Sequence, residues 1–235
     1  MRKIVITGLG AVTPLGGDLN SSWKNLISGK SGASTITKFD PTGYPCTIAC
    51  EVPLGDGLNA NDGSFNANDW ISPKDQKKVD TFILYGIAAA EMALKDSGWK
   101  PQTDEDSFRA GVGVGSGIGG LASIEKTALL LNEKGPRRVS PFFIPGALIN
   151  LAAGQISIKN NLKGPNLAAV TACASGSHSI GEGAQMIKNN KADVMLVGGA
   201  EAAICPIGMA GFSASRALST NFNEIPEKAS RPYDK

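Results

Sequence analysis

The sequence is poor in the residues that build metal sites and disulfide frameworks. It contains one histidine, His178, and four cysteines, Cys46, Cys50, Cys173 and Cys205, with no C-x-x-C pair. This supply disfavours the usual Cys/His zinc sites. Four cysteines in 235 residues also do not make the disulfide scaffold of a small secreted protein. We therefore expect no metal, no cofactor, and free thiols in a reducing compartment.

An excess of one charge and long apolar runs are also missing. Lys and Arg total 23 against 21 Asp and Glu, a net charge of +2, so no global positive field argues for nucleic acid. No apolar run is long enough to span a bilayer, and the start MRKIVITGLG shows no signal peptide. Hydrophobic residues at 42% and charged residues at 19% exclude a disordered chain. We expect a globular cytoplasmic protein that binds neither nucleic acid nor membrane.

Short runs of β-branched or small residues alternate with segments of helical periodicity. This alternation predicts βαβ crossovers, parallel strand pairing and therefore an α/β fold. The clearest helix, residues 72–97, has Ser72 and Pro73 at its start and Gly98 at its end. In the helix that follows Gly120, residues such as Ile124 and Leu131 are expected to face inward. The predicted strands are residues 3–9, 109–114, 167–172 and 193–199, and further helices are predicted at 19–30, 145–158 and 174–190.

Two glycine-rich loops follow predicted strands. The segment GSGIGG, residues 115–120, fits the G-x-G-x-x-G turn that binds a pyrophosphate at a helix N-terminus, and Gly8-Leu-Gly10 follows the first strand. That fingerprint also requires an acidic residue about 20 residues later, at the end of the next strand. After Gly120 the region reads GPRRVSPFF, which is basic and not a strand end. A nucleotide-binding oxidoreductase is therefore disfavoured, and glycines that permit close helix–sheet packing are the alternative.

Cys173 ends a run of small apolar residues and opens a predicted helix, in the segment VTACASGS. A thiol at the positive end of a helix dipole is favoured as the thiolate, and free N–H groups there can bind a developing oxyanion. These features predict a nucleophile, with a buried cysteine that fills a small core site as the alternative. His178 lies about 140° round the same predicted helix, so we interpret it as structural rather than as a general base.

Basic residues cluster at the start of the predicted helix 72–97, where Lys74, Lys77 and Lys78 oppose the helix dipole. Arg137 and Arg138 form a second cluster. A solvated face is the ordinary interpretation of such runs, but the unfavourable position favours an acidic partner. No aromatic residues interleave with them, which disfavours a platform for single-stranded nucleic acid.

Blocks of sequence spread from residue 4 to residue 235 occur in a recognisable order. They are VITGLGAVTPLG, ISPKDQKKVD, VGSGIGGL, GPRRVSPFFIPGALIN, GPNLAAVTACASGSHSIGEGAQMI, ADVMLVGGAEAAI and GFSASRALST…ASRPYDK. Together they resemble the β-ketoacyl-[acyl-carrier-protein] synthase II family. The resemblance implies a thiolase-like fold, in which two similar βαβαβ halves pack into an αβαβα sandwich, with residues 1–235 as the N-terminal half. It also implies fatty acid elongation by decarboxylating Claisen condensation.

The same resemblance assigns roles to individual residues. Cys173 matches the nucleophile that takes the acyl chain from acyl carrier protein, and its own N–H matches one oxyanion donor. Ile118, Phe142 and Phe143 match positions that line the acyl tunnel and the contact of a homodimer. The positions that match the basic docking surface for acyl carrier protein are Lys74, Lys77, Lys78, Arg137, Arg138 and Arg216.

The match is confined to one half of the family's sequence. The family's two catalytic histidines, its active-site lysine and its second oxyanion donor belong to the other half, and this sequence stops at ASRPYDK. We therefore expect a truncated chain that is unable to condense alone. A non-catalytic remnant that binds carrier protein or dimerises is the alternative. Chain-length factors are disfavoured because they replace the nucleophilic cysteine, and thiolases because they use coenzyme A esters.

Overall fold

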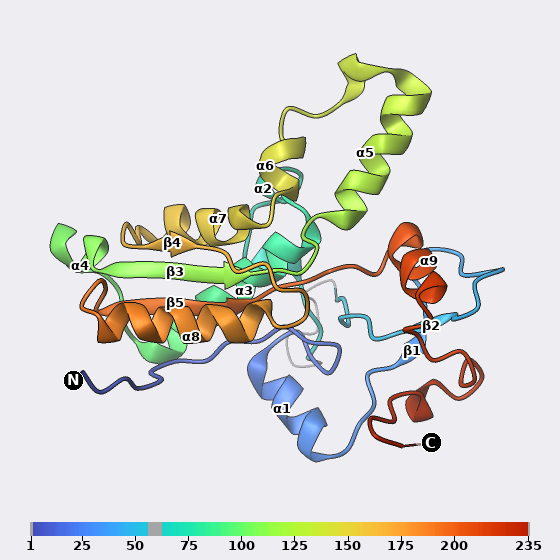
Figure 1. Cartoon of the computed structure of the whole chain (residues 1–235), viewed down its shortest axis with the longest axis horizontal. Coiled ribbons are helices and arrows are strands. Elements are labelled where there is room, and N and C mark those ends of the chain that lie inside the picture. Colours follow the sequence, from blue (N-terminus) through green and yellow to red (C-terminus); the bar gives the residue numbers. More distant parts are fainter. Residues whose placement is uncertain (1, 56–62, 235) are drawn as a thin grey trace. The chain divides into compact units, whose positions relative to one another are not determined.

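The computed structural model describes residues 2–55 and 63–234, and the chain divides into two compact units. The first unit comprises residues 1–10 and 67–202, and the second comprises residues 11–66 and 203–235 (Figure 1). The elements of the first unit are η1 (Ala67–Asp69), α2 (Pro73–Gln76), α3 (Thr81–Ser97), α4 (Asp104–Phe108), β3 (Ala110–Gly115), α5 (Leu121–Lys134), η2 (Pro136–Arg138), α6 (Phe143–Ala147), α7 (Asn150–Asn160), β4 (Asn166–Leu167), α8 (Ser175–Lys188) and β5 (Val194–Gly199). Those of the second are α1 (Leu19–Ile27), β1 (Ser34–Thr35), β2 (Ile48–Ala49), α9 (Pro206–Ala214) and η3 (Pro226–Lys228).

The first unit is built round a parallel sheet in the order β4-β3-β5. The central strand β3 has the sequence AGVGVG, and all of its residues are buried. Its glycines lie on the face that α8 covers, where a Cβ on Gly115 would come within 2.9 Å of the Ser175 Cβ. Helix α8 also has small residues on the face that packs on the sheet, since its buried residues are Ser175, Ser179 and Gly183. Small residues on both sides bring α8 close to the sheet (Figure 1).

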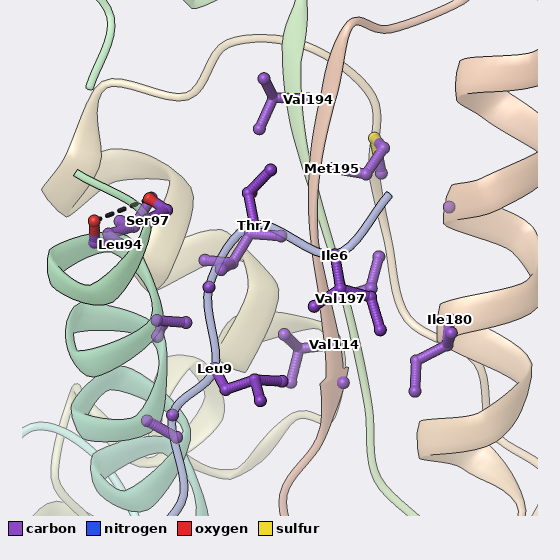
Figure 2. Close-up of a pocket in the computed structure, with 18 of the residues that line it drawn as sticks. Ile6, Thr7, Leu9, Leu94, Ser97, Val114, Ile180, Val194, Met195 and Val197 are labelled. Atoms are coloured by element: carbon purple, nitrogen blue, oxygen red, sulfur yellow. Dashed lines mark hydrogen bonds between the residues drawn. The ribbon is translucent and has the colours of Figure 1, made fainter. Parts of the chain in front are cut away.

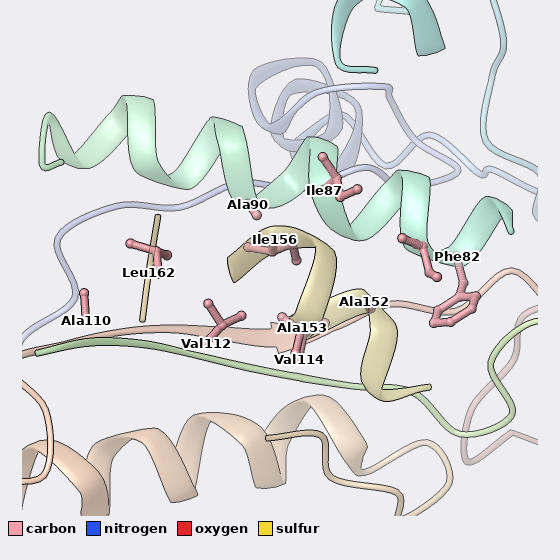
Figure 3. Close-up of a cluster of buried hydrophobic side chains, with 11 residues drawn as sticks. Phe82, Ile87, Ala90, Ala110, Val112, Val114, Ala152, Ala153, Ile156 and Leu162 are labelled. Atoms are coloured by element: carbon pink, nitrogen blue, oxygen red, sulfur yellow. The ribbon is translucent and has the colours of Figure 1, made fainter. Parts of the chain in front are cut away.

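The other face of β3 carries the main hydrophobic core. Val112 and Val114 point toward α7 and α3, which supply Ile156 and Phe82 among others (Figure 3). The full set of buried side chains is Phe82, Ile83, Ile87, Ala90, Ala110, Val112, Val114, Ala152, Ala153, Ile156 and Leu162. The sheet therefore lies between α8 on one face and α7 with α3 on the other, in the helix–sheet–helix layers expected of an α/β fold.

The predicted helix 72–97 is in fact two helices, α2 and α3, separated at Lys77–Asp80. The break occurs at Asp80, whose buried carboxylate caps α3 by accepting a hydrogen bond from the N–H of Phe82 at 3.2 Å. The same carboxylate accepts from the N–H and the hydroxyl of Ser123 on α5, at 3.0 and 2.6 Å. The Asp80 N–H donates to the carbonyl of Gly146 at 3.0 Å. One buried residue thus connects the starts of α3 and α5 to α6.

Asp80→Ala is expected to lower the free energy of unfolding by about 2–3 kcal/mol, because it removes a helix cap and leaves Ser123 without its partner. The matched control is Asp104→Ala, which removes a carboxylate that is 85% exposed. Urea unfolding of both variants is the measurement. A midpoint for Asp80→Ala that equals that of Asp104→Ala would contradict the structural role given to Asp80.

Other predictions of secondary structure were also wrong in detail. Residues 3–9 form no strand, and the strand expected at 167–172 is only the two residues Asn166–Leu167. Helix α5 has no buried residue, and Ile124 and Leu131, which were expected to face inward, are 43% and 45% exposed. The helix predicted at 145–158 is divided between the end of α6 and α7, with extended backbone at Leu148. The predictions of β3, β5 and α8, and of the Gly98 stop after α3, are confirmed within a few residues.

The second unit has a small core of its own. Ile36, Cys46, Ile48 and Met209 are buried together, with Phe222 among the half-buried residues packed against them. Strands β1 and β2 pair antiparallel, and the side chain of Asn223 bonds the backbone at Thr47 and Pro45. Segments from both ends of the sequence therefore fold together in this unit.

Candidate active site

The turn between β4 and α8 carries Cys173. Its backbone is forced into an unusual shape at Ala172, whose φ of +51° is in the left-handed region that residues with a Cβ rarely adopt. Ser175 holds this shape, because its hydroxyl accepts from the Thr171 N–H at 2.9 Å and donates to the Ala172 carbonyl at 2.7 Å. A hydrogen bond of 3.1 Å from the Ala174 N–H to the Thr171 carbonyl closes the turn. The result is a tight, side-chain-braced loop that presents Cys173 at the start of α8.

Cys173 is exposed, and its backbone N–H is available to donate a hydrogen bond. Within residues 2–55 and 63–234, the N–H of Cys173 has no hydrogen-bond acceptor. The N-cap of α8, Ala174, provides no side-chain cap. A nucleophilic sulfur beside an unbonded N–H at a helix start is the arrangement that stabilises the oxyanion formed when a thiolate attacks a carbonyl carbon.

The other thiols are less suited to nucleophilic attack. Cys46 and Cys205 are buried, at 3% and 4% exposure. Cys50 is exposed as a residue, but burial of the thiol by neighbouring atoms raises its pKa above the usual value. A higher pKa leaves less thiolate at neutral pH. Exposure and chemistry therefore single out Cys173 among the four.

His178 is occupied by a structural contact. Its Nδ1 lies 2.6 Å from the hydroxyl of Thr171, so the ring braces the nucleophile turn from the side of α8. This bond agrees with the prediction of a polar-satisfied structural histidine. The base and acid chemistry of a Cys–His pair is not provided by His178 in this geometry.

The glycine-rich loop between β3 and α5 lies beside the nucleophile turn. A Cβ on Gly117 would come within 3.2 Å of the Ala172 carbonyl group, and a Cβ on Gly120 within 2.6 Å of the Ala147 Cα. The loop therefore packs against the Cys173 turn on one side and the end of α6 on the other. Ile118, at the tip of the loop, is 37% exposed and lies one residue from this contact.

A carboxylate already fills the anion position of that loop. Glu201 accepts hydrogen bonds from the N–H groups of Gly117, Ile118 and Gly119 at 2.8, 2.9 and 3.2 Å. These are the amides that a pyrophosphate would need in a dinucleotide site. The geometry therefore argues against the oxidoreductase alternative. Glu201 was not predicted from the sequence, because the dinucleotide fingerprint places its acid about 20 residues after the loop, whereas Glu201 follows β5.

The remaining predicted site residues belong to several elements of the two units. Phe142 and Phe143 lie at the start of α6, and Phe142 is 44% exposed with the ammonium of Lys78 over its ring at 5.4 Å. Lys78 is half-buried, and its Nζ lies 2.6 Å from the Asp75 carboxylate. Lys74, Lys77, Arg137 and Arg138 are exposed in the first unit, and Arg216 is exposed in the second.

The lysines do not lie in the first turns of a long helix, as was predicted. Lys74 belongs to the four-residue helix α2, and Lys77 is the C-cap of α2. A cation at a helix C-terminus is favourable, so the placement of Lys77 does not oppose a dipole. What remains is that Lys74 and Lys77 are exposed.

A cavity of about 630 Å³ lies elsewhere in the first unit, between residues 4–10, α3, α8 and β5 (Figure 2). Its lining is largely apolar and includes Ile6, Val197 and Ile180. Cys173 is not among the lining residues. Residues 4–10 and β5 both line this cavity, and the predicted first strand pairs with no strand among the described residues.

The comparisons with known proteins agree with this geometry. The family model described as "Beta-ketoacyl synthase, N-terminal domain" matches residues 1–235. The chain belongs to this family. Among its curated relatives are the 3-oxoacyl-[acyl-carrier-protein] synthases 2 of Rhizobium meliloti (strain 1021), 56% identical over 234 residues, and of Vibrio cholerae serotype O1, 48% identical over 234 residues. Both matches cover 100% of this chain, but only 55% and 54% of the relatives.

Solved ketosynthases share the fold. A β-ketoacyl synthase from Burkholderia phymatum STM815 is 28% identical with a TM-score of 0.83, over 100% of this chain and 55% of that one. A type II polyketide ketosynthase, in complex with its acyl carrier protein and bound to a hexaketide, is 25% identical with a TM-score of 0.73, over 92% of this chain and 55% of that one. The predicted thiolase-like fold is thus confirmed. The chain spans about half the length of the relatives it matches.

Membrane-spanning helices and metal-binding clusters are both absent from the described residues. None of the helices in residues 2–55 and 63–234 combines the length and apolar character needed to cross a bilayer. The same residues contain no cluster of three or more His, Cys, Asp or Glu side chains arranged to hold a metal ion.

Proposed function

We propose that Cys173 accepts an acyl group from acyl carrier protein, as the first step of a 3-oxoacyl-[acyl-carrier-protein] synthase of fatty acid biosynthesis. In the complete enzyme, condensation with malonyl carrier protein follows, with loss of carbon dioxide. The observation that carries the proposal is the exposed Cys173 thiol on a strained turn, beside its own unbonded N–H. Membership of the β-ketoacyl synthase family supports it.

The acyl transfer is a thioester exchange. The Cys173 thiolate attacks the thioester carbonyl carbon, and the negative charge moves to the carbonyl oxygen, where the Cys173 N–H stabilises it. Collapse of the tetrahedral intermediate re-forms the carbonyl and expels the carrier thiolate. The proton released from Cys173 ends on the carrier thiol, so the overall step exchanges one thioester for another without an oxidant or a cofactor.

The proposed function includes a carrier-protein partner, a homodimer and a cytoplasmic location. Acyl carrier protein is the proposed acidic partner, and the solved ketosynthase complex supports this for a related protein. A homodimer is supported by the unburied helix α5, on which Leu129 is 65% exposed. The proposed location is the cytoplasm. The alternative is a non-catalytic chain that binds carrier protein or dimerises, and it predicts docking without transfer.

A discharge assay separates the two candidates. Carrier protein bearing a radiolabelled acyl group is incubated with the purified 235-residue chain, and label on each protein is read after denaturing electrophoresis. Label that moves to the chain and is released by hydroxylamine, which cleaves thioesters, supports acyl transfer. Label that stays on carrier protein, while the two proteins still bind each other, supports the alternative.

Lys77→Glu is expected to weaken binding of acyl carrier protein about tenfold, because it reverses an exposed charge in the proposed docking surface. Raised salt is expected to weaken the parent in the same direction. Lys77 is a cleaner probe than Lys78, because reversing Lys78 also breaks its pair with Asp75. The control is Lys191→Glu, an exposed lysine just before β5, at the opposite end of that strand from Glu201. If calorimetry gives the same affinity for acyl carrier protein in Lys77→Glu and Lys191→Glu, Lys77 is not part of the docking surface.

A further inference from the structure

Two segments far apart in the sequence meet at one edge of the sheet. Strands β3 and β5 are parallel, and Gly115 at the end of β3 pairs with Gly199 at the end of β5. The N–H of Ala200 continues the ladder by donating to the Gly115 carbonyl at 3.0 Å. The next residue after Ala200 is Glu201, and the residues after Gly115 are the glycine-rich loop. Parallel pairing therefore delivers the carboxylate to the loop at the carboxyl edge, where α/β folds place their ligands.

Glu201 uses both carboxylate oxygens on this loop. Oε2 accepts from the N–H groups of Gly117 and Ile118, at 2.8 and 2.9 Å, and Oε1 accepts from Gly119 at 3.2 Å. Hydrogen bonds to an ionised acceptor are about twice as strong as neutral ones. Gly120, the N-cap of α5, provides no side-chain cap, and the hydroxyl of Ser116 also accepts from the Gly119 N–H, at 3.1 Å. Glu201 is thus the acceptor for the amides of Gly117 and Ile118, and it shares the Gly119 amide with Ser116.

The fixed loop is in contact with the nucleophile turn. A Cβ on Gly117 would lie 3.1 Å from Glu201 Oε2 and 3.2 Å from the carbonyl carbon and oxygen of Ala172. Gly117 is therefore enclosed between the carboxylate and the strained residue that precedes Cys173. Ile118 follows on the same backbone, so its side chain is positioned by the same carboxylate.

We propose that Glu201 is a positioning residue for acyl transfer, which holds Ile118 beside the Cys173 turn and so determines how well long acyl chains are accepted. The inference rests on the proposed acyl transfer to Cys173. Glu201 neither attacks the substrate nor moves a proton. Its loss frees the amides of Gly117 and Ile118 and lets Ile118 move, which penalises a long apolar chain that packs on Ile118 more than an acetyl group that does not reach it.

The test compares acyl lengths in the 235-residue chain. The rate of Cys173 acylation is measured with dodecanoyl- and acetyl-carrier protein for the parent, Glu201→Ala and Glu201→Gln. For Glu201→Ala, the dodecanoyl-to-acetyl rate ratio is expected to fall about tenfold. Glu201→Gln is expected to lose less, because its amide oxygen still accepts while its NH₂ cannot. Iodoacetamide labelling of Cys173 is expected to stay within about twofold of the parent in both variants, since the thiol and its helix are unchanged.

The control is Glu182→Gln, an equal charge change at an exposed position on α8, which is expected to leave the ratio unchanged. Hydrogen exchange adds a readout that needs no acylation. The amides of Gly117 and Ile118 are expected to lose protection in Glu201→Ala, whereas those of β3 keep it and that of Gly119 keeps its bond to Ser116. Unchanged protection at the loop, or an equal loss of rate for both acyl lengths, would overturn the role of Glu201. A parent chain that is never acylated would instead overturn the proposed function, and this inference with it.

Discussion

Cys173→Ala is expected to abolish acyl transfer to this chain, whereas Cys50→Ala is expected to leave the rate within about twofold of the parent. Cys173 is exposed at the start of α8 with its own N–H unbonded, and no other thiol combines these features. Cys46 and Cys205 are buried, and the pKa of Cys50 is raised by burial. Acylation rates measured by mass spectrometry for the two variants decide the matter.

Electrophile labelling provides an independent control for this prediction. An acyl-thioester mimic or a cerulenin-type electrophile is applied in limiting amount, and the modified peptide is identified by mass mapping. Modification is expected first at Cys173. Preferential modification of Cys50, or persistent acylation of Cys173→Ala, would show that the wrong thiol has been assigned.

The 235-residue chain is also expected to lack condensing activity. The 235-residue chain is expected to take an acyl group but to form no ketoacyl product, because decarboxylation of malonyl-thioester requires donors that stabilise the enolate oxygen. In the family these are two histidines, and the only histidine of this sequence, His178, is bonded to Thr171. Each missing oxyanion donor typically costs ~10²–10³ in rate, so the loss of several is expected to put turnover below detection.

The measurement is an assay of the purified chain with acyl- and malonyl-carrier protein. Ketoacyl product is followed by mass spectrometry, and Cys173→Ala controls for contaminating host enzyme. The expected result is one acyl group per chain and no product. Repeated formation of ketoacyl product by the parent, but not by Cys173→Ala, would show that groups within this chain suffice for condensation.

The sheet was predictable where hydrogen bonding and packing follow local pattern. The small and apolar residues of β3 and α8 predict that these elements are buried against each other. Gly98 predicts the end of α3, because glycine readily adopts the positive φ, here 64°, of a helix C-cap. The break at Asp80 was not predictable from periodicity, because apolar spacing continues across it. Asp80 caps α3 and is held by contacts with Ser123 on α5 and Gly146 on α6, which lie far along the sequence. Residues 3–9 have strand composition but form no strand, because composition does not specify a pairing partner, and in the structure residues 4–10 line a cavity.

The candidate site likewise contains one residue that local sequence predicts, Cys173, and one that it does not, Glu201. Cys173 could be found from sequence, because a nucleophile between a strand and a helix is a local feature. Glu201 could not be found by a search over about 20 residues, because it lies 84 residues after Gly117. A signal did exist: the acid in GGAE follows a predicted strand, and carboxyl ends of parallel strands meet at one edge of a sheet. Parallel pairing of the predicted strands 109–114 and 193–199 places this acid beside the glycine-rich loop.

Acyl transfer to Cys173 is tested most simply by the intact mass of the chain after incubation with acyl-loaded carrier protein. The expected result is a mass increase of one acyl group, which hydroxylamine removes and peptide analysis maps to Cys173. A chain that binds acyl carrier protein yet keeps its original mass, or that carries the acyl group on another residue, would contradict it.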